Sequence, residues 1–458
     1  MKSLANRWRY FGLRLLLVLL PATCAWRGYA GEGVTNALAL DPMLDQSGAI
    51  WKINRDDFMA GYEWKGFRWE STDRKVARAA DLPFSLFGLP IWEARVHFEE
   101  DKPNLLVFSL YNRGDAGDLD KGNFGALLQK AKAALDQWTG TTAKPVEEQF
   151  NTTGVKRQGL SWTAASGVAR LLWSFSTKDA AGHLAYRSEY IRMEIAPAMA
   201  AGAGVGAAVP ARQNASHAAD TVSPAALKER VKKDAAGDVR IDGVPMIDQG
   251  QKGYCAAATA ERVMRYYGIE VDEHEIAQIV SSSSIGGTDP RVMIDALKRV
   301  SVKLGCKIKV LDELDVDSFT KLVNQYNQLA KKNKKPVITL GRVIEVSFIY
   351  HAMDLDLLRE ARLKQQGDYR RYLAQIEQFV DEGIPLVWGV VVGKVPETPP
   401  LHGVGGHLRL IIGYNSKSGE VLYTDSWGAG HELKRMKMED AWAITQGLFV
   451  IEPRWKTM

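Results

Sequence analysis

Apolar and polar residues alternate in the first half of the chain in the way that half-buried strands require. Over residues 92–98 the apolar positions are Trp92, Ala94, Val96 and Phe98. This period of two predicts a strand with one buried face. Residues 100–104 then form a turn-prone segment, and the apolar run 105–108 follows it. We therefore expect the two stretches to pair as an antiparallel hairpin.

A helix is expected next, because the apolar residues then recur at helical spacing. Asn123 is predicted to cap it, and its apolar face comprises Phe124, Leu127, Leu128, Ala131, Leu135 and Trp138. Residues 168–175 and 184–195 predict a further hairpin. These patterns indicate one α+β domain over residues 36–195. Its tryptophans are assigned to the core rather than to a ligand platform, namely Trp51, Trp64, Trp69 and Trp92.

The composition changes abruptly at residue 196. Residues 196–222 are dominated by Ala, Gly, Val and Pro, a composition that is typical of a flexible linker. Ser223 and Pro224 follow, and a serine cap with proline in the first turn predicts the start of a short helix.

The second half, residues 239–455, has helices first and strands last. We expect a helix over 255–267 that Gly268 ends, a helix opening at 288–290, and one long charged helix over 357–380. Residues 384–392 form a continuous apolar run, which predicts a buried strand. Further strands are expected at 408–413, 421–425 and 448–452, completing an antiparallel sheet. The whole chain is therefore predicted to be α+β, with an accessory domain, a linker and a second domain.

The first thirty residues have the pattern of a secretory signal peptide. Basic residues precede the apolar run 15–20, and Gly28-Tyr29-Ala30 offers a cleavage site. We therefore expect export to the periplasm or the medium, with an uncleaved membrane anchor as the alternative. The chain carries a net charge of +5, but these residues hold five basic and no acidic side chains, so 54 of each sign remain after cleavage. A nucleic-acid partner is not expected for a neutral chain, nor is an integral membrane domain after cleavage.

Three cysteines are present, and Cys24 would leave with the signal peptide. The remaining pair, Cys255 and Cys306, is too few for a disulfide scaffold in a chain of this length. A bridge between them would block a reactive thiol at Cys255. We interpret Cys306 as a buried thiol at the start of a strand.

The candidate chemistry begins at Cys255, where a loop enters a helix. A helix N-terminus carries partial positive charge, which predicts a lowered thiol pKa. Gln249 lies six residues upstream, and its amide can donate to an oxyanion together with the Cys255 backbone N–H. A lone cysteine is usually an ordinary buried residue, but the glutamine and the glycine-flanked turn between them favour a reactive one.

A base and an orienting carboxylate are available further along the chain. His407 begins an apolar strand, which would hold its imidazole rigidly, and Asp425 ends the neighbouring strand. The carboxylate can fix the imidazole tautomer. Each has an alternative role, as a core histidine or a turn residue. Other histidines are weaker candidates: His402 lies in a loop, and His431 is expected to be solvated. No cofactor is expected, and no metal-ligand spacing is present.

The set resembles the papain-like cysteine peptidase superfamily, and within it the bacterial C39-like domains related to bacteriocin leader peptidases. The matching pieces are the Gln-x5-Cys start, the Gly-His-x5-Gly-Tyr strand and the Asp-Ser-Trp-Gly strand end. The resemblance covers residues 239–455 and implies a papain-like fold, with N-terminal helices and a C-terminal antiparallel sheet. It implies Cys255 as nucleophile, His407 as acid/base, Asp425 as its orienting group and Gln249 in the oxyanion hole.

The sequence thus predicts an exported cysteine peptidase that acts on a peptide or protein. Two alternatives stay open. One is a non-catalytic peptide-binding module of the same fold, against which the intact Cys255, His407 and Asp425 argue. The other is acyl transfer to an amine, as in transglutaminase-like enzymes. The accessory domain can recognise substrate, tether the enzyme or shield the cleft. Neither the substrate nor the oligomeric state can be read from the sequence.

Overall fold

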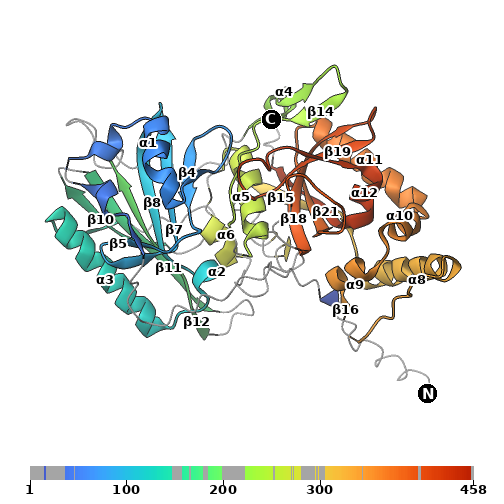
Figure 1. Ribbon diagram of the computed structural model, residues 1–458, viewed down its shortest axis with the longest axis horizontal. Helices are drawn as coiled ribbons and strands as arrows, with labels where there is room; N and C mark the ends of the chain where they lie inside the picture. The colour runs from blue at the N-terminus through green and yellow to red at the C-terminus, as the bar shows by residue number, and fades with distance from the viewer. Residues whose placement is uncertain are drawn as a thin grey trace.

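Two large antiparallel sheets, each with its own hydrophobic core, dominate the computed structural model (Figure 1). The structure describes residues 15–16, 37–45, 47–146, 157–164, 167–178, 184–198, 222–250, 253–269, 271, 273–279, 294–295, 298, 305–342, 344–400 and 404–454. We call residues 37–198 the N-terminal region and residues 222–454 the C-terminal region. The predicted α+β class with antiparallel sheets is confirmed.

The sheet of the N-terminal region has eight strands. Their spatial order is β3 (Arg68–Trp69), β4 (Val76–Ala79), β7 (Glu93–Glu99), β8 (Lys102–Asn112), β12 (Leu184–Ala196), β11 (Gly167–Lys178), β10 (Gln158–Ala164) and β9 (Lys144–Pro145). The predicted strand over 92–98 is confirmed, because Ala94, Val96 and Phe98 of β7 are buried. The hairpin of β11 and β12 is confirmed as well.

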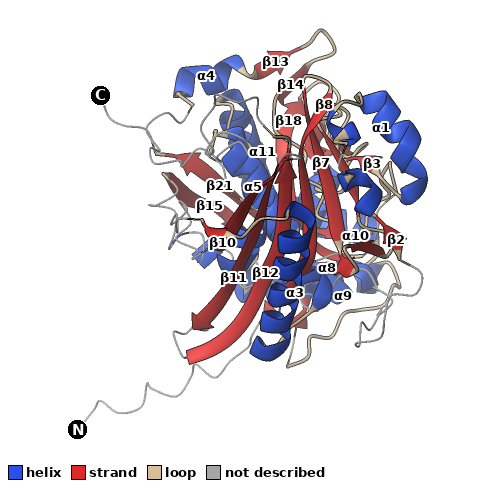
Figure 2. Cartoon of the chain, turned by 90° about the vertical axis from the view of Figure 1, so that its left-hand side faces the viewer, coloured by secondary structure: helices blue, strands red, loops and turns tan. Residues whose placement is uncertain are grey.

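Helices and a small sheet complete the N-terminal region, and α3 lies along the large sheet (Figure 2). These elements are β2 (Leu38–Ala39), β5 (Phe84–Leu86), β6 (Leu89–Ile91), α1 (Arg55–Tyr62), α2 (Arg113–Ala116), α3 (Lys121–Thr139) and three 3-10 turns at Asp41–Leu44, Ala49–Trp51 and Glu63–Lys65. The cap of α3 is Asp120, not Asn123. Its carboxylate accepts from the N–H groups of residues 122 and 123, so the helix begins two residues before the predicted cap. Trp64 is 67% exposed, and its assignment to the core was wrong.

The sheet of the C-terminal region is built around β18 (Gly405–Asn415). The main order is β13 (Val231–Lys233), β14 (Asp238–Ile241), β18, β17 (Leu386–Val392), β21 (Thr445–Pro453) and β15 (Cys306–Glu313). β19 (Glu420–Thr424) also pairs with β18, and β20 (Lys434–Lys437) pairs with β19. Every residue of β17 is buried, as its unbroken apolar run predicts.

Helices surround this sheet, and α5 lies between it and the N-terminal region (Figure 1). They are α4 (Pro224–Glu229), α5 (Cys255–Tyr266), α6 (Glu273–Ile279), α8 (Val316–Lys332), α9 (Val346–Ala352), α10 (Leu355–Leu363), α11 (Gln366–Asp381) and α12 (Met438–Ile444). A short parallel pair joins β1 (Leu15–Leu16) to β16 (Ile344–Glu345). Among the described residues, no helix has the length and apolarity needed to cross a membrane.

The predicted single helix over 357–380 is wrong, because α10 ends at Leu363 and α11 begins at Gln366. Tertiary hydrogen bonds compete with the helix at this break. The carbonyl of Arg362 accepts from the Trp442 indole at 3.1 Å, and the Arg362 guanidinium donates to the carbonyl oxygens of Trp442 and Thr445. By contrast, α4 has the predicted Ser223 cap. The helix predicted to open at 288–290 lies outside the described residues.

Candidate active site

Cys255 is the first residue of α5, and small side chains bring this helix close to β18. The buried alanines that follow the cysteine allow the approach, and Thr259 Oγ1 donates to the carbonyl of Leu408 at 3.3 Å. Deeper in the helix, Arg262 donates to the carbonyl of Asp425 at 2.6 Å and to Thr424 Oγ1 at 2.7 Å. The start of α5 is therefore fixed against β18, which carries His407, and against Asp425, which follows β19.

The Cys255 thiol is only 4% exposed. Burial raises its pKa to about 11, although backbone N–H groups of Leu408, Ala256 and Cys255 itself act in the opposite direction. The lowered pKa expected from the helix N-terminus is thus not found, because the cost of burying a thiolate outweighs the stabilisation from these donors. In the resting structure the proton stays on sulfur. Cys255 and Cys306 are both buried, as predicted for Cys306.

His407 lies on β18 opposite Val390 of β17, so regular strand pairing fixes its backbone. Its Nε2 is 3.4 Å from Oδ1 of Asp425, and its ring stacks on Trp427 with centroids 4.1 Å apart and planes 5° apart. Burial lowers the His407 pKa despite the nearby carboxylate. The imidazole is therefore neutral at rest. Within the described part of the chain, no hydrogen bond joins it to Cys255.

Asp425 is completely buried and lies among several cationic or imidazole groups. Arg409 Nε is 2.7 Å from Oδ1, Lys434 Nζ is 3.3 Å from Oδ2, and His431 Nδ1 is 3.6 Å from Oδ2. Burial opposes ionisation, but the Arg409 guanidinium and the nearby His407 imidazole hold the Asp425 pKa well below its usual range. The carboxylate is therefore ionised and has an oxygen directed at the imidazole of His407.

A second buried carboxylate, Glu397, balances this cluster. It lies 3.0 Å from Arg409 and 2.9 Å from Lys434. None of these three residues is predicted from the sequence to belong to the site. Arg409 gave the detectable signal, since a charged side chain within an apolar strand must find a buried partner. His431 was expected to be solvated, but only 3% of it is exposed, because its ring lies beside Asp425 and Trp427.

Gln249 joins the loop before α5 to the residue after Asp425. Its backbone N–H donates to the carbonyl of Ser426 at 2.9 Å, and its amide oxygen accepts from Ser426 Oγ at 2.6 Å. With the oxygen bound in this way, Nε2 is the amide atom suited to donate to an oxyanion. Three consecutive residues therefore contact the candidate catalytic side chains: Asp425 and Trp427 hold His407, and Ser426 holds Gln249. His402 lies outside the described residues.

Residues 241–449 match the family model described as "Peptidase_C39 like family". No curated protein matches the chain. Among solved structures, the peptidase domain of Streptococcus ComA, a bi-functional ABC transporter involved in a quorum sensing pathway, is 13% identical, with 46% of this chain and 99% of that chain covered and a TM-score of 0.25. Xylellain, a cysteine protease from Xylella fastidiosa, is 15% identical, with 51% and 90% covered and a TM-score of 0.24.

The fold, the buried thiol and the family match define the C-terminal region as a cysteine-type peptidase domain. More narrowly, the match of residues 241–449 is to the Peptidase C39-like family. The resemblance expected from the sequence is thereby confirmed.

Proposed function

We propose that the chain is an exported cysteine peptidase whose catalytic residues are Cys255, His407 and Asp425, with Gln249 in the oxyanion hole. One observation carries this assignment: residues 425–427 hold both His407 and Gln249. A binding-only module does not need an ionised carboxylate buried beside an imidazole. The N-terminal segment 1–30 is proposed as the signal for export.

The position of Asp425 selects the reactive nitrogen of His407. Because Nε2 faces the carboxylate, Nδ1 is the atom that takes the thiol proton. The resting site holds that proton on sulfur, so proton transfer accompanies substrate binding instead of preceding it. The transfer requires the ring and the thiol to come within hydrogen-bond reach, a contact that we propose forms in the substrate complex.

The reaction then proceeds by acyl transfer to sulfur. The Cys255 thiolate attacks the peptide carbonyl, and Gln249 Nε2 and the Cys255 N–H donate to the oxygen as it becomes negative. His407 passes its proton to the leaving amine, and the C–N bond breaks. A water molecule, deprotonated by His407, then attacks the thioester carbonyl. The C–S bond breaks, the acid is released, and His407 returns the proton to the Cys255 sulfur.

The proposed architecture has three further parts. Residues 36–195 form an accessory domain, residues 196–222 a linker, and residues 239–455 a papain-like domain. The separate hydrophobic cores on the two sheets support this division. The change in composition at residue 196 supports the position of the linker.

Labelling with a thiol-directed acylating probe tests the assignment of the nucleophile. Cys255→Ala should abolish labelling, whereas Cys306→Ala should leave it unchanged, because that variant retains the proposed nucleophile and Cys306, at the start of β15, lies outside the proposed site. Equal labelling of the two variants would overturn the assignment. Product analysis with and without an added amine separates hydrolysis from acyl transfer, and we expect the free acid in both cases.

A further inference from the structure

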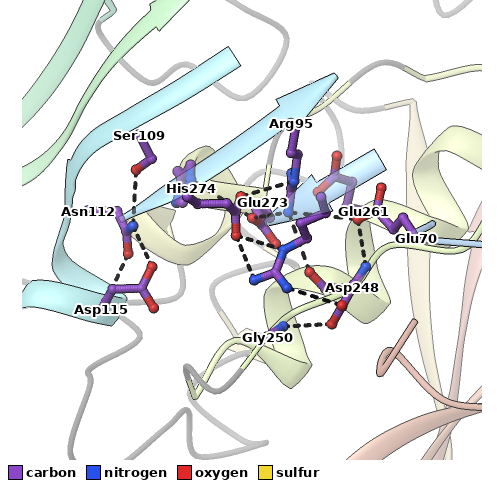
Figure 3. Close-up of polar contacts among 12 residues, drawn as sticks. Glu70, Arg95, Ser109, Asn112, Asp115, Asp248, Gly250, Glu261, Glu273 and His274 are labelled. Atoms are coloured by element: carbon purple, nitrogen blue, oxygen red, sulfur yellow. Dashed lines mark hydrogen bonds and ion pairs between the residues drawn. The ribbon is translucent and has the colours of Figure 1, made fainter. Parts of the chain in front are cut away.

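The N-terminal region contacts both ends of the loop that carries Gln249 and leads into Cys255. This loop runs from Asp248 to Cys255, and the structure describes residues 248–250 and 253–255 of it. Figure 3 shows Glu70 and Arg95 beside Asp248 at its beginning. At its other end, Tyr254 contacts α2. The loop is therefore held by groups that lie more than a hundred residues earlier in the chain.

Asp248 receives three contacts from the N-terminal region. Its backbone N–H donates to Glu70 Oε1 at 2.8 Å, and its carboxylate Oδ2 lies 3.1 Å from Arg78 Nη1. Arg95 Nη2 approaches its carbonyl oxygen at 3.4 Å. The other carboxylate oxygen accepts from the N–H of Gly250 at 2.8 Å. Backbone and side chain are thus both fixed on the two sides of Gln249.

These contacts belong to a buried network of ion pairs, so they are not easily rearranged. Glu93 lies 2.7 Å from Arg78 and 2.9 Å from Arg95, and Arg95 also pairs with Glu273 of α6 at 2.9 Å. Removing one member of such a network leaves a buried charge without its partner, which is strongly unfavourable. The network therefore keeps Asp248 in one arrangement.

Tyr254 is held by a close contact with the backbone. Its hydroxyl accepts from the N–H of Gly114 at 3.1 Å. A Cβ atom at position 114 would lie 2.3 Å from the tyrosine ring, so this approach requires glycine. Because Tyr254 immediately precedes Cys255, the contact fixes the direction in which α5 begins.

We propose that the N-terminal region is a positioning element of the active site: Glu70, Arg78 and Gly114 hold the loop so that Gln249 and Cys255 face the same oxyanion. This inference rests on the proposed function. Oxyanion donors act only when they are held within a fraction of an ångström of the productive position. The N-terminal region is therefore required for acylation. If it were instead a removable shield, its loss would raise the rate of acylation.

The same interface supplies a matched control away from the loop. Gln278 of α6 accepts from Ser174 Oγ at 2.8 Å through its amide oxygen and donates to Ser176 Oγ at 3.0 Å. The backbone carbonyl of Gln278 also accepts a hydrogen bond from the Arg187 guanidinium at 3.2 Å. Gln278→Ala thus weakens contact between the regions without touching Asp248 or Tyr254.

The experiment compares Asp248→Asn, Arg78→Met and Gln278→Ala in the full chain. Four quantities are measured: kcat and KM for a p-nitrophenyl ester or peptide, the rate of Cys255 alkylation by iodoacetamide, and hydrogen exchange of the amides in residues 248–255. Alkylation develops no oxyanion, so it reports on the thiol alone. Asp248→Asn keeps the acceptor for Gly250 and loses only charge, which makes it the conservative partner of Arg78→Met.

We expect Asp248→Asn and Arg78→Met to lower kcat by about tenfold to a hundredfold. This loss is no larger than the loss expected when one oxyanion donor is removed. KM and alkylation should change little, and loop amides should exchange faster. Gln278→Ala should change none of these. Faster hydrolysis in Arg78→Met, or equal effects of Arg78→Met and Gln278→Ala, would overturn the proposal. If the wild-type chain hydrolyses nothing, the proposed function fails. Hydrogen exchange of the loop amides then decides by itself whether the ion-pair network around Asp248 holds the loop.

Discussion

The Nε atom of Arg409 lies 2.7 Å from Oδ1 of Asp425, and both side chains are completely buried. An ion pair this deep is costly to break, because the remaining charge has no access to water. The strand that carries His407 therefore also carries the cation that keeps its partner carboxylate ionised. This relationship makes the stability of the C-terminal region depend on the same carboxylate as the proposed catalysis.

Replacing Arg409 should destabilise the protein and make it sensitive to acid. Arg409→Met is expected to lower the free energy of unfolding by about 3–5 kcal/mol at neutral pH. The lowered pKa of Asp425 stabilises the fold above the unfolded value of 3.8, and this contribution disappears as pH falls through the folded pKa. The substitution raises that folded pKa, so stability is lost at a higher pH.

Urea unfolding between pH 3 and 7 measures this effect. The matched control is Arg435→Met, which removes a half-exposed partner of Asp238 and should cost about 1 kcal/mol or less. Equal losses in the two variants would contradict the role given to Arg409.

The pH dependence of Cys255 alkylation should reflect a thiol that is protonated at rest. Since burial raises its pKa to about 11, the thiolate fraction grows about tenfold for each pH unit up to that value. The alkylation rate with iodoacetamide should therefore keep rising beyond pH 9 in the Cys306→Ala background. A rate that reaches a plateau below pH 8 would instead reveal a thiolate–imidazolium pair already formed in the free protein.

Removing the Gln249 amide should impair acylation without changing the thiol. Gln249→Ala is expected to lower kcat by about 10²-fold, the usual effect of losing one oxyanion donor. Ser426→Ala should give a smaller loss, because it removes only the bond that orients the amide oxygen. Steady-state kinetics and alkylation are compared in the same preparations. A matching fall in alkylation for Gln249→Ala would show general damage to the site.

Gly250 allows the turn that brings Asp248 against Arg78. Its φ is +65°, and a Cβ there would lie 2.3 Å from a guanidinium nitrogen of Arg78. Gly250→Ala should therefore cost about 1–2 kcal/mol from backbone strain, and more from displacement of Arg78. Thermal unfolding and kcat should both decrease. Gly243→Ala is the control, because it has a similar positive φ but nothing within 4 Å of the added carbon. Gly243→Ala should lower the thermal stability through backbone strain but should leave kcat unchanged.

Local patterns predicted much of the secondary structure because they act over a few residues. The alternation in β7 and the apolar run in β17 gave strands, and Gly268 follows α5 as expected. The break between α10 and α11 could not be predicted, since it depends on hydrogen bonds between Arg362 and the distant Trp442.

In the candidate site, too, the sequence motifs predict some features, whereas others depend on tertiary structure. Gln249, Cys255, His407 and Asp425 stand in recognisable motifs, and all four lie within residues 241–449, the span that matches the family model. Their surroundings depend on tertiary structure: Arg409 and Lys434 converge on Asp425 from different strands. The raised pKa of Cys255 likewise follows from burial, which a motif does not reveal.

The most direct test of the account is the initial rate of peptide hydrolysis by the full chain and by Cys255→Ala, prepared and purified in parallel. A substrate library of varied sequence avoids any assumption about specificity, and new amino termini are quantified by mass spectrometry. The account predicts cleavage by the wild-type chain and a loss of at least about 10³-fold in the variant, since no other group replaces the nucleophile. Cleavage by Cys255→Ala at the wild-type rate would contradict it.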